Sequence, residues 1–161
     1  MKIKNFLFVV MIFFLLGIGD AFAAKTAPDF DLKDLNGKSI SLKKYSGKVV
    51  LVDFWASWCG PCRKSFPWMN KVQKEYGKKG FEVVAINLDT ERELVDEFLT
   101  KNKAQFKIAL DPEGKTAERY GVIAMPSAYL VDGKGKIVQS YHGFLKKDVL
   151  KKEKHIQELL K

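Results

Sequence analysis

Apolar residues form two near-continuous runs in this chain. Residues 48–55 and 81–88 are rich in valine and contain few polar side chains. A run that is apolar at successive positions is typical of a strand buried on both faces of a sheet. Both segments are therefore predicted to be central strands, and residues 106–110 are predicted to form a shorter one.

Segments with helical periodicity alternate with these strands. Residues 61–76 are predicted to be a helix, because Pro61 suits a first turn and Gly77 suits a stop. Pro67 lies inside this segment and is expected to kink it. Further helices are predicted at residues 91–101, 113–120 and 146–160, and the last of them has Val149, Ile156 and Leu160 on one stripe.

Turn signals identify two hairpins. Asn36-Gly37 separates short strands at 30–32 and 39–42, and residues 132–135 separate strands at 127–131 and 136–142. Strands that alternate with helices and end in a hairpin and a helix predict an α/β sheet with helices on both faces. The length of 161 residues fits one domain.

The N-terminus has the pattern of an export signal. Lys2 and Lys4 precede an uncharged apolar run at 6–18, and Ala21-Phe22-Ala23 matches a cleavage site. We predict a signal peptide at 1–23 and a domain at 24–161, located in the periplasm or at the extracytoplasmic face. The alternative is that residues 6–18 remain as a membrane anchor.

The net charge is +9, with lysines in every segment of the chain. This pattern favours a solvated basic surface, and attraction to an anionic membrane or an acidic partner stays open. No nucleic-acid partner is expected for an exported chain without a clustered basic stripe.

Cys59 and Cys62 are the only cysteines. An exported chain meets an oxidising compartment, where cysteines usually pair. A bridge between them would close a very small loop and would stabilise the fold little, which favours a redox-active disulfide over a structural one. Cys59 would precede the helix, where free N–H groups favour a thiolate. It would attack a partner disulfide, and the shielded Cys62 would resolve the mixed disulfide.

Metal binding offers alternative explanations of the pair. A zinc site would need both His142 and His155, and their separation does not match the usual spacing of three to five residues. Cys59, Cys62 and Met125 could instead bind Cu(I) as soft ligands of a copper carrier. We otherwise expect neither a metal nor a cofactor.

Asp53 lies in the middle of the apolar run at 48–55. A carboxylate in a dry strand is costly, and burial should raise its pKa. It could take the proton from Cys62 during exchange. The alternative is a solvent-facing residue at the end of a strand.

The stretch 52–62, Val-Asp-Phe-Trp-Ala-Ser-Trp-Cys-Gly-Pro-Cys, resembles the active-site segment of thioredoxin. Pro67 matches the family's kinking proline, and Met125-Pro126 falls at its cis-proline loop. The residues 27–30 and the added helix and strand at 91–110 resemble the TlpA/ResA-like branch of exported thiol–disulfide oxidoreductases.

The resemblance implies a thioredoxin-like fold with a mixed central sheet, an N-terminal hairpin and an inserted helix and strand. It implies a cis peptide before Pro126 and a substrate surface made of Trp58, Gly60, Pro61, Met125 and Pro126. It also implies a protein disulfide reductase that a membrane thiol donor keeps reduced. We expect the protein to be a monomer. Disulfide-containing proteins, with apocytochrome c among them, would be its substrates in cytochrome c maturation.

Departures from the branch bear on the direction of electron flow. Asp53 and Gly60-Pro61 match thioredoxin itself, and this match favours a pair that reduces its substrates. Ala85, in contrast, stands where thioredoxin has a buried lysine near the aspartate. A disulfide oxidase or isomerase of the same fold is the alternative. A peroxidase is disfavoured because Ala56 stands where that class needs threonine or serine.

Overall fold

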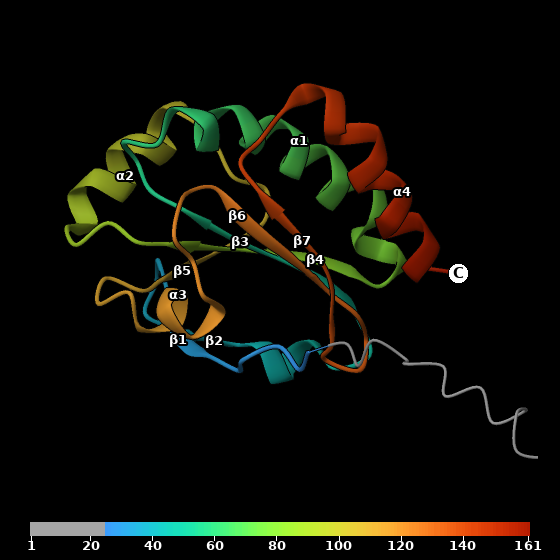
Figure 1. Cartoon of the computed structure of the whole chain (residues 1–161). Coiled ribbons are helices and arrows are strands. Elements are labelled where there is room, and N and C mark those ends of the chain that lie inside the picture. The colour runs from blue at the N-terminus through green and yellow to red at the C-terminus, as the bar shows by residue number, and fades with distance from the viewer. Residues whose placement is uncertain (1–24) are drawn as a thin grey trace, which may run out of the picture.

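The computed structural model describes residues 25–161, and the predicted signal segment at 1–23 lies outside them. Within the described residues, seven strands form one sheet in the order β2-β1-β5-β4-β3-β6-β7 (Figure 1). The strands are Asp31–Asp34 (β1), Ser39–Ser41 (β2), Val49–Trp55 (β3), Phe81–Asn87 (β4), Lys107–Leu110 (β5), Ser127–Val131 (β6) and Ile137–His142 (β7). The α-helices are Gly60–Tyr76 (α1), Arg92–Lys101 (α2), Lys115–Tyr120 (α3) and Val149–Leu159 (α4).

The sheet is mixed, as predicted. β3, β4 and β5 run parallel, and the remaining pairs are antiparallel. The N-terminal hairpin β1–β2 joins the sheet through β5, which belongs to the inserted segment. The two additions to the fold therefore pair with each other at one edge. Both predicted hairpins are confirmed.

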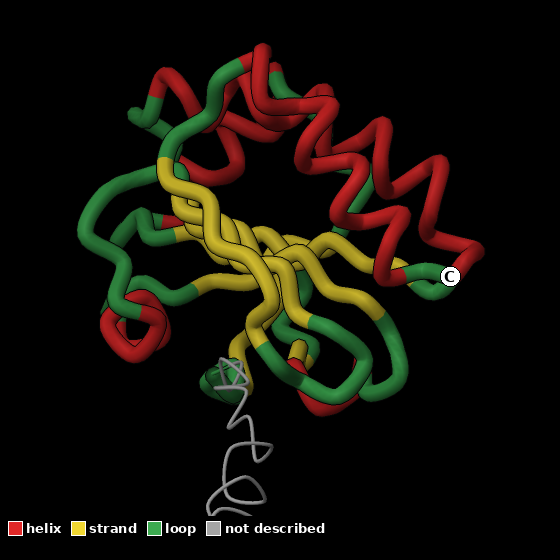
Figure 2. The backbone as a smooth tube through the Cα atoms, turned by 45° about the vertical axis from the view of Figure 1, so that its right-hand side comes forward, coloured by secondary structure: helices red, strands yellow, loops and turns green. Residues whose placement is uncertain are grey.

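Helices cover both faces of the sheet (Figure 2). Alternate residues of β3 divide between two cores, because successive side chains of a strand point to opposite faces. Leu51 and Trp55 pack with side chains of α1, α2 and α4, whereas Val52 and Phe54 pack with α3 and the N-terminal segment. All seven residues of β3 are buried, which explains its continuous apolar run.

The helix α1 ends at Tyr76 with Gly77 as its C-cap, as predicted. A 3-10 turn follows over Gly77–Lys79, and Gly80 is the left-handed residue at its end. Two other helices begin later than predicted. The helix α3 begins at Lys115 rather than at residue 113, because Gly114 is left-handed. The buried Asp111 carboxylate accepts hydrogen bonds from the first backbone N–H groups of this helix, at Thr116 and Ala117. The last helix is preceded by a 3-10 turn at Lys146–Asp148.

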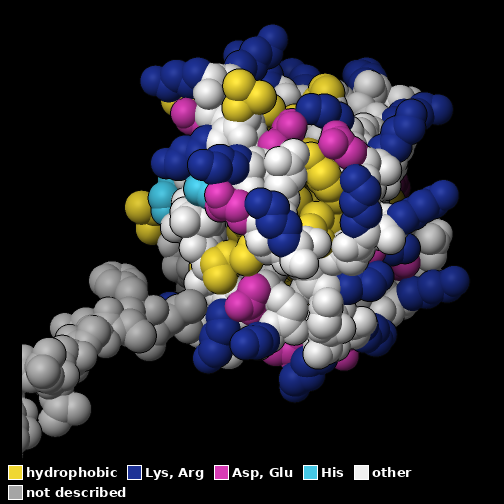
Figure 3. Space-filling model, turned by 90° about the vertical axis from the view of Figure 1, so that its right-hand side faces the viewer, with side chains coloured by type: hydrophobic (Ala, Val, Ile, Leu, Met, Phe, Trp, Pro, Cys, Tyr) yellow, Lys and Arg dark blue, Asp and Glu magenta, His cyan; other side chains and the backbone are white. Residues whose placement is uncertain are grey.

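No helix among residues 25–161 has the length and apolar character needed to cross a bilayer. Lysine and arginine side chains are scattered over the face in Figure 3, with acidic side chains between several of them.

Phe66 of α1 holds the helical layer against the sheet. Its ring centroid lies 4.9 Å from that of Trp55, 5.0 Å from that of Phe98 and 5.2 Å from that of Phe106. We expect Phe66→Ala to lower the free energy of unfolding by about 3–5 kcal/mol, because the cavity cannot collapse between three rings. Urea unfolding measures the loss. The control Leu150→Ala removes a side chain that is 79% exposed and should change stability by less than about 0.5 kcal/mol.

Candidate active site

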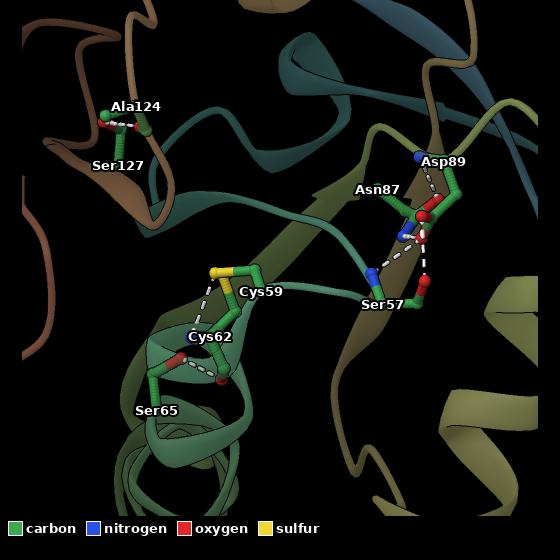
Figure 4. The surroundings of a disulfide bond; sticks show 8 residues. All are labelled: Ser57, Cys59, Cys62, Ser65, Asn87, Asp89, Ala124 and Ser127. Carbon is green, nitrogen blue, oxygen red and sulfur yellow. Dashed lines mark hydrogen bonds between the residues drawn. A yellow bond between two sulfur atoms is a disulfide. The ribbon is translucent and has the colours of Figure 1, made fainter.

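The cysteine pair lies where β3 leads into α1. Cys59 is the N-cap of α1, and its Sγ accepts a hydrogen bond from the backbone N–H of Cys62 at 3.2 Å. The two residues form a disulfide (Figure 4). Cys62 has no exposed surface and Cys59 is 4% exposed, whereas the neighbouring Trp58 is 71% exposed. Both cysteines are thus buried, with Cys59 at the helix terminus beside an exposed residue and Cys62 enclosed in the first turn of the helix.

The loop before β6 lies at the same edge of the sheet. Ser127, the first residue of β6, pairs with Phe54 near the end of β3. The Met125–Pro126 peptide bond just before it is cis, as the resemblance implied. Pro126 accepts a hydrogen bond from Gly143 N–H at 2.7 Å, and Ser127 Oγ donates to the carbonyl of Ala124 at 2.7 Å. These bonds fix the loop, and its Met125 packs against the core cluster that contains both cysteines.

Asp53 is buried in the middle of β3, as predicted. It is 4% exposed, and its Oδ2 has no hydrogen-bond partner among the described residues. Burial raises the pKa of Asp53 from its ordinary value of 3.8 to about 7, and the Lys152 ammonium opposes this rise. Asp53 shares a face of β3 with Leu51 and Trp55, and these two pack in the same core as both cysteines. A carboxyl group that titrates near neutrality therefore lies in the layer behind the disulfide.

A buried carboxylate that the sequence reasoning missed holds the loop before Cys59. Asp89 Oδ2 accepts from Ser57 N–H at 2.8 Å, and Oδ1 accepts from Ser57 Oγ–H at 2.9 Å. Asn87 Nδ2 donates to the same carboxylate at 2.7 Å (Figure 4). Asp89 follows the end of β4, which runs parallel to β3 and so ends at the same edge. Its position directly after a buried strand was the signal available in the sequence.

We expect Asp89→Ala to destabilise the protein by about 2–3 kcal/mol. The change leaves the Ser57 N–H and the Asn87 amide without their charged acceptor. Urea unfolding of the oxidised protein measures the loss. Ser57→Ala removes a single hydrogen bond of this network and should cost about 1 kcal/mol. Equal losses in the two variants would show that the Ser57 hydroxyl is the only important contact of Asp89.

A groove of about 470 Å³ lies beside Trp58, between α1 and α2. Its walls combine apolar and charged side chains, among them Trp58, Arg63, Leu94 and the ion pair of Lys101 with Glu97. In the loop before Met125, Ile123 is 94% exposed and adds a large apolar side chain to the surface. The accessible surface around the disulfide is therefore partly apolar.

The two histidines do not meet at the cysteines. His142 Nδ1 lies 3.2 Å from Ser127 Oγ, and His155 Nδ1 lies 2.9 Å from Tyr141 Oη. Within residues 25–161, no three His, Cys, Asp or Glu side chains are grouped as metal ligands would be. The arrangement gives no support to a zinc site.

Comparison with known proteins agrees with this geometry. A model of the Redoxin family matches residues 22–160. The thiol-disulfide oxidoreductase ResA of Bacillus thuringiensis subsp. konkukian is 39% identical over 126 residues, which are 78% of this chain and 73% of that protein.

Solved structures resemble the fold as well. The crystal structure of a thiol:disulfide interchange protein DsbE from Chlorobium tepidum has a TM-score of 0.83 at 45% identity, over 86% of this chain and 97% of that one. An exposed lipoprotein thioredoxin from Streptococcus pneumoniae has a TM-score of 0.70 at 30% identity, over 82% of this chain and 100% of that one. The chain therefore belongs to the Redoxin family, and it is a thiol–disulfide oxidoreductase with a thioredoxin-like fold.

Proposed function

We propose that Cys59 and Cys62 are the redox centre of an exported protein disulfide reductase. The observation that carries this proposal is the unequal placement of the two cysteines. Cys59 caps α1 next to the exposed Trp58, and Cys62 is fully buried one turn further on. One thiol is thus placed to meet a substrate, and the other is placed to act only after the first.

The first step is attack by the Cys59 thiolate. The N-terminus of α1 and the backbone N–H of Cys62 favour negative charge on this sulfur. The thiolate attacks one sulfur of the substrate disulfide, the substrate S–S bond breaks, and the other substrate sulfur leaves as a thiolate. A mixed disulfide now joins Cys59 to the substrate.

The second step is resolution by Cys62. Its thiol gives its proton to the Asp53 carboxylate, directly or through water, and the resulting thiolate attacks Cys59 Sγ. The mixed disulfide breaks, the substrate leaves as a second thiolate, and Cys59 and Cys62 become a disulfide. The substrate gains two electrons in the cycle, and two protons complete its thiols. A dithiol donor must then reduce the pair again.

The docking surface lies around the two loops at the sheet edge. The backbone of Met125, beside the cis Pro126, makes no backbone hydrogen bond within residues 25–161, so it is available to pair with an extended substrate segment by β-augmentation. Trp58, Gly60 and Pro61 form the other side of this surface. Main-chain pairing needs no particular substrate sequence, which suits an enzyme that meets its substrates as unfolded chains.

The substrates we propose are disulfide-bonded proteins outside the cytoplasm, with apocytochrome c as the leading candidate. Support comes from the export signal predicted at 1–23 and from the similarity to proteins named ResA. A membrane thiol protein would supply the electrons. The protein acts as a monomer in this scheme.

Trapping tests the proposal. In Cys62→Ser the first step proceeds and the second cannot, so substrates should remain linked to Cys59 when the variant is expressed in the native host. The control Cys59→Ser/Cys62→Ser carries no thiol and should capture none. Identification of apocytochromes by mass spectrometry would support the maturation role, whereas a broad mixture would indicate a general reductant. Absence of any Cys59-linked protein would contradict the proposed reductase.

Two assays separate the rival activities. Anaerobic titration of the reduced protein with Cu(I) tests the carrier that Cys59, Cys62 and Met125 could form. Fast disulfide reduction together with weak copper binding would exclude the carrier. The redox potential separates a reductase from an oxidase, since 30 mV corresponds to about 1.4 kcal/mol for a two-electron couple. Refolding of a scrambled substrate tests isomerase activity.

A further inference from the structure

A buried lysine lies within the helical layer that covers the active-site face. Lys152 of α4 is 5% exposed, although lysine is almost never buried without a partner. Its Nζ lies 4.9 Å from the ring centroid of Tyr141, 5.0 Å from that of Phe144 and 5.6 Å from that of Trp68. We call these three rings the aromatic cradle. Among residues 25–161, no ion pair includes Lys152.

Cation–π attraction explains only part of this placement. Each ring stabilises an ammonium by about 0.5–2 kcal/mol. Burial of an isolated cation costs several kcal/mol, which the three rings offset only in part. A nearby negative charge is therefore expected. The neighbouring Glu153 is engaged elsewhere, because its carboxylate accepts from Lys71 Nζ and from Trp68 Nε1.

Strand register brings the aromatic cradle close to Asp53. Asp53 pairs with Ala128 of β6, and Ala128 pairs with Tyr141 of β7. Directly paired residues of adjacent strands point to the same face, and adjacent strands are about 4.8 Å apart. Only the methyl group of Ala128 stands between Asp53 and Tyr141 in this row. No large side chain of the sheet therefore separates the Asp53 carboxylate from the ammonium above Tyr141.

Among the described residues, the other elements around Asp53 contribute no competing cation. β4 presents Ala85 directly beside it, so the residue at that register position carries no charge. The helix α1 contributes the two cysteines, and β7 contributes Tyr141, whose hydroxyl is engaged with His155. Within residues 25–161, Lys152 is the one charged group that acts on the pKa of Asp53. Asp53 and Asp148 in turn oppose the lowering of the Lys152 pKa by burial.

We propose that Lys152 is a positioning residue for the thiol chemistry, which acts through Asp53 by favouring the carboxylate that receives the proton of Cys62. This inference rests on the proposed function of Asp53. Without the cation, the desolvated carboxyl would hold a proton at neutral pH and could not accept another. Cys62 would then lose its proton more slowly, and the mixed disulfide would persist. The aromatic cradle keeps the ammonium in place without a hydrogen-bonded anion that would neutralise it.

The experiment compares single-turnover reduction of a disulfide-bonded peptide across the pH range from about 5.5 to about 9.5. Lys152→Met removes the charge and keeps an unbranched apolar side chain. We expect the acid limb of its pH–rate profile to shift to higher pH by about one unit. This shift lowers the rate at pH 7 about fivefold and leaves the rate at high pH unchanged. Lys152→Arg should restore the original limb. The matched control Lys151→Met removes an exposed charge from the same helix and should behave as wild type.

A second measurement does not depend on activity. The Asp53 carboxyl carbon, followed by carbon-13 NMR in the oxidised protein, should titrate at higher pH in Lys152→Met than in wild type. Lys152→Gln serves the same comparison if the methionine variant does not fold. An unchanged carboxyl titration together with an unchanged rate profile would overturn the inference.

The variant Asp53→Asn separates this inference from the proposed function. If Asp53→Asn keeps the wild-type profile, the proton-accepting role of Asp53 is wrong. If Asp53→Asn changes the profile and Lys152→Met does not, only the inference about Lys152 is wrong. In the double variant, loss of Lys152 should add no further effect to that of Asp53→Asn, because the lysine acts through the aspartate. A further loss there would show that Lys152 has only a structural role.

Discussion

Replacement of Cys59 by serine is expected to abolish disulfide reduction, with a rate at least about a thousandfold below that of the wild type. A serine hydroxyl is not ionised at neutral pH and cannot form the mixed disulfide. The N-terminus of α1, which favours a thiolate at this position, has no comparable effect on an alcohol. Stopped-flow reduction of a disulfide-bonded peptide by the reduced protein measures the effect.

Cys62→Ser is the matched comparison for this result. It should attack the peptide at a rate close to that of wild type and then stop as a mixed disulfide, so that its first step remains while turnover is lost. The fully buried position of the second sulfur explains the difference. Retained attack in Cys59→Ser and lost attack in Cys62→Ser would reverse the roles assigned to the two cysteines.

Replacement of Asp53 by asparagine is expected to stabilise the oxidised protein by about 4 kcal/mol at pH 8 and to change its stability little near pH 3. Asparagine resembles the protonated carboxyl group in shape and remains neutral at every pH. The gain therefore reports the cost of holding an ionised carboxylate in the core.

The sign of this prediction follows from the raised pKa of Asp53. Below pH 3.8 the carboxyl is protonated in the folded and the unfolded chain, so it contributes no penalty. Between pH 3.8 and about 7 the unfolded chain ionises while the folded protein keeps its proton, so the free energy of unfolding falls as the pH rises. Each pH unit lowers it by about 1.36 kcal/mol, and the fall ends above the folded pKa.

Urea unfolding of both oxidised proteins at several pH values tests this expectation. Asp96→Asn is the control, because it makes the same change of charge at an exposed side chain and should alter stability by less than about 0.5 kcal/mol. A difference between Asp53→Asn and wild type that stays constant from pH 4 to pH 8 would contradict the raised pKa. The same variant should resolve mixed disulfides slowly at neutral pH, so greater stability would accompany lower activity.

Local sequence patterns predicted much of the fold. The continuous apolar runs predicted β3 and β4, because a strand covered on both faces needs apolar side chains at successive positions. The Asn36-Gly37 turn predicted the N-terminal hairpin. Gly77 predicted the end of α1 at Tyr76, and it is the C-cap of that helix. The 3-10 turn that follows and the left-handed Gly80 were not predicted, because a glycine marks a possible stop without specifying the backbone conformation after it.

The charged side chains of α4 show where the sequence pattern did not decide which residues are buried. Lys152 and Glu153 fall on the same helical stripe as Val149 and Ile156, yet charged residues in a lysine-rich helix are ordinarily assigned to its solvated face. Both are buried. Their partners, Trp68 for both and Tyr141 for Lys152, belong to other elements, so no local pattern could identify them.

The sequence by itself determined the residues of the thiol–disulfide site and the kind of reaction they support. Two cysteines at the start of a helix, a carboxylate in the preceding strand and a proline before β6 are local features, and each can be recognised from its neighbours along the chain. Only the tertiary structure decided what surrounds them. The Asp89 carboxylate that holds the Cys59 loop comes from the loop after β4, and the Lys152 ammonium near Asp53 comes from α4. Their effects depend on distances across the sheet and between layers, and the periodicity of a single segment specifies which face is buried without specifying what covers it.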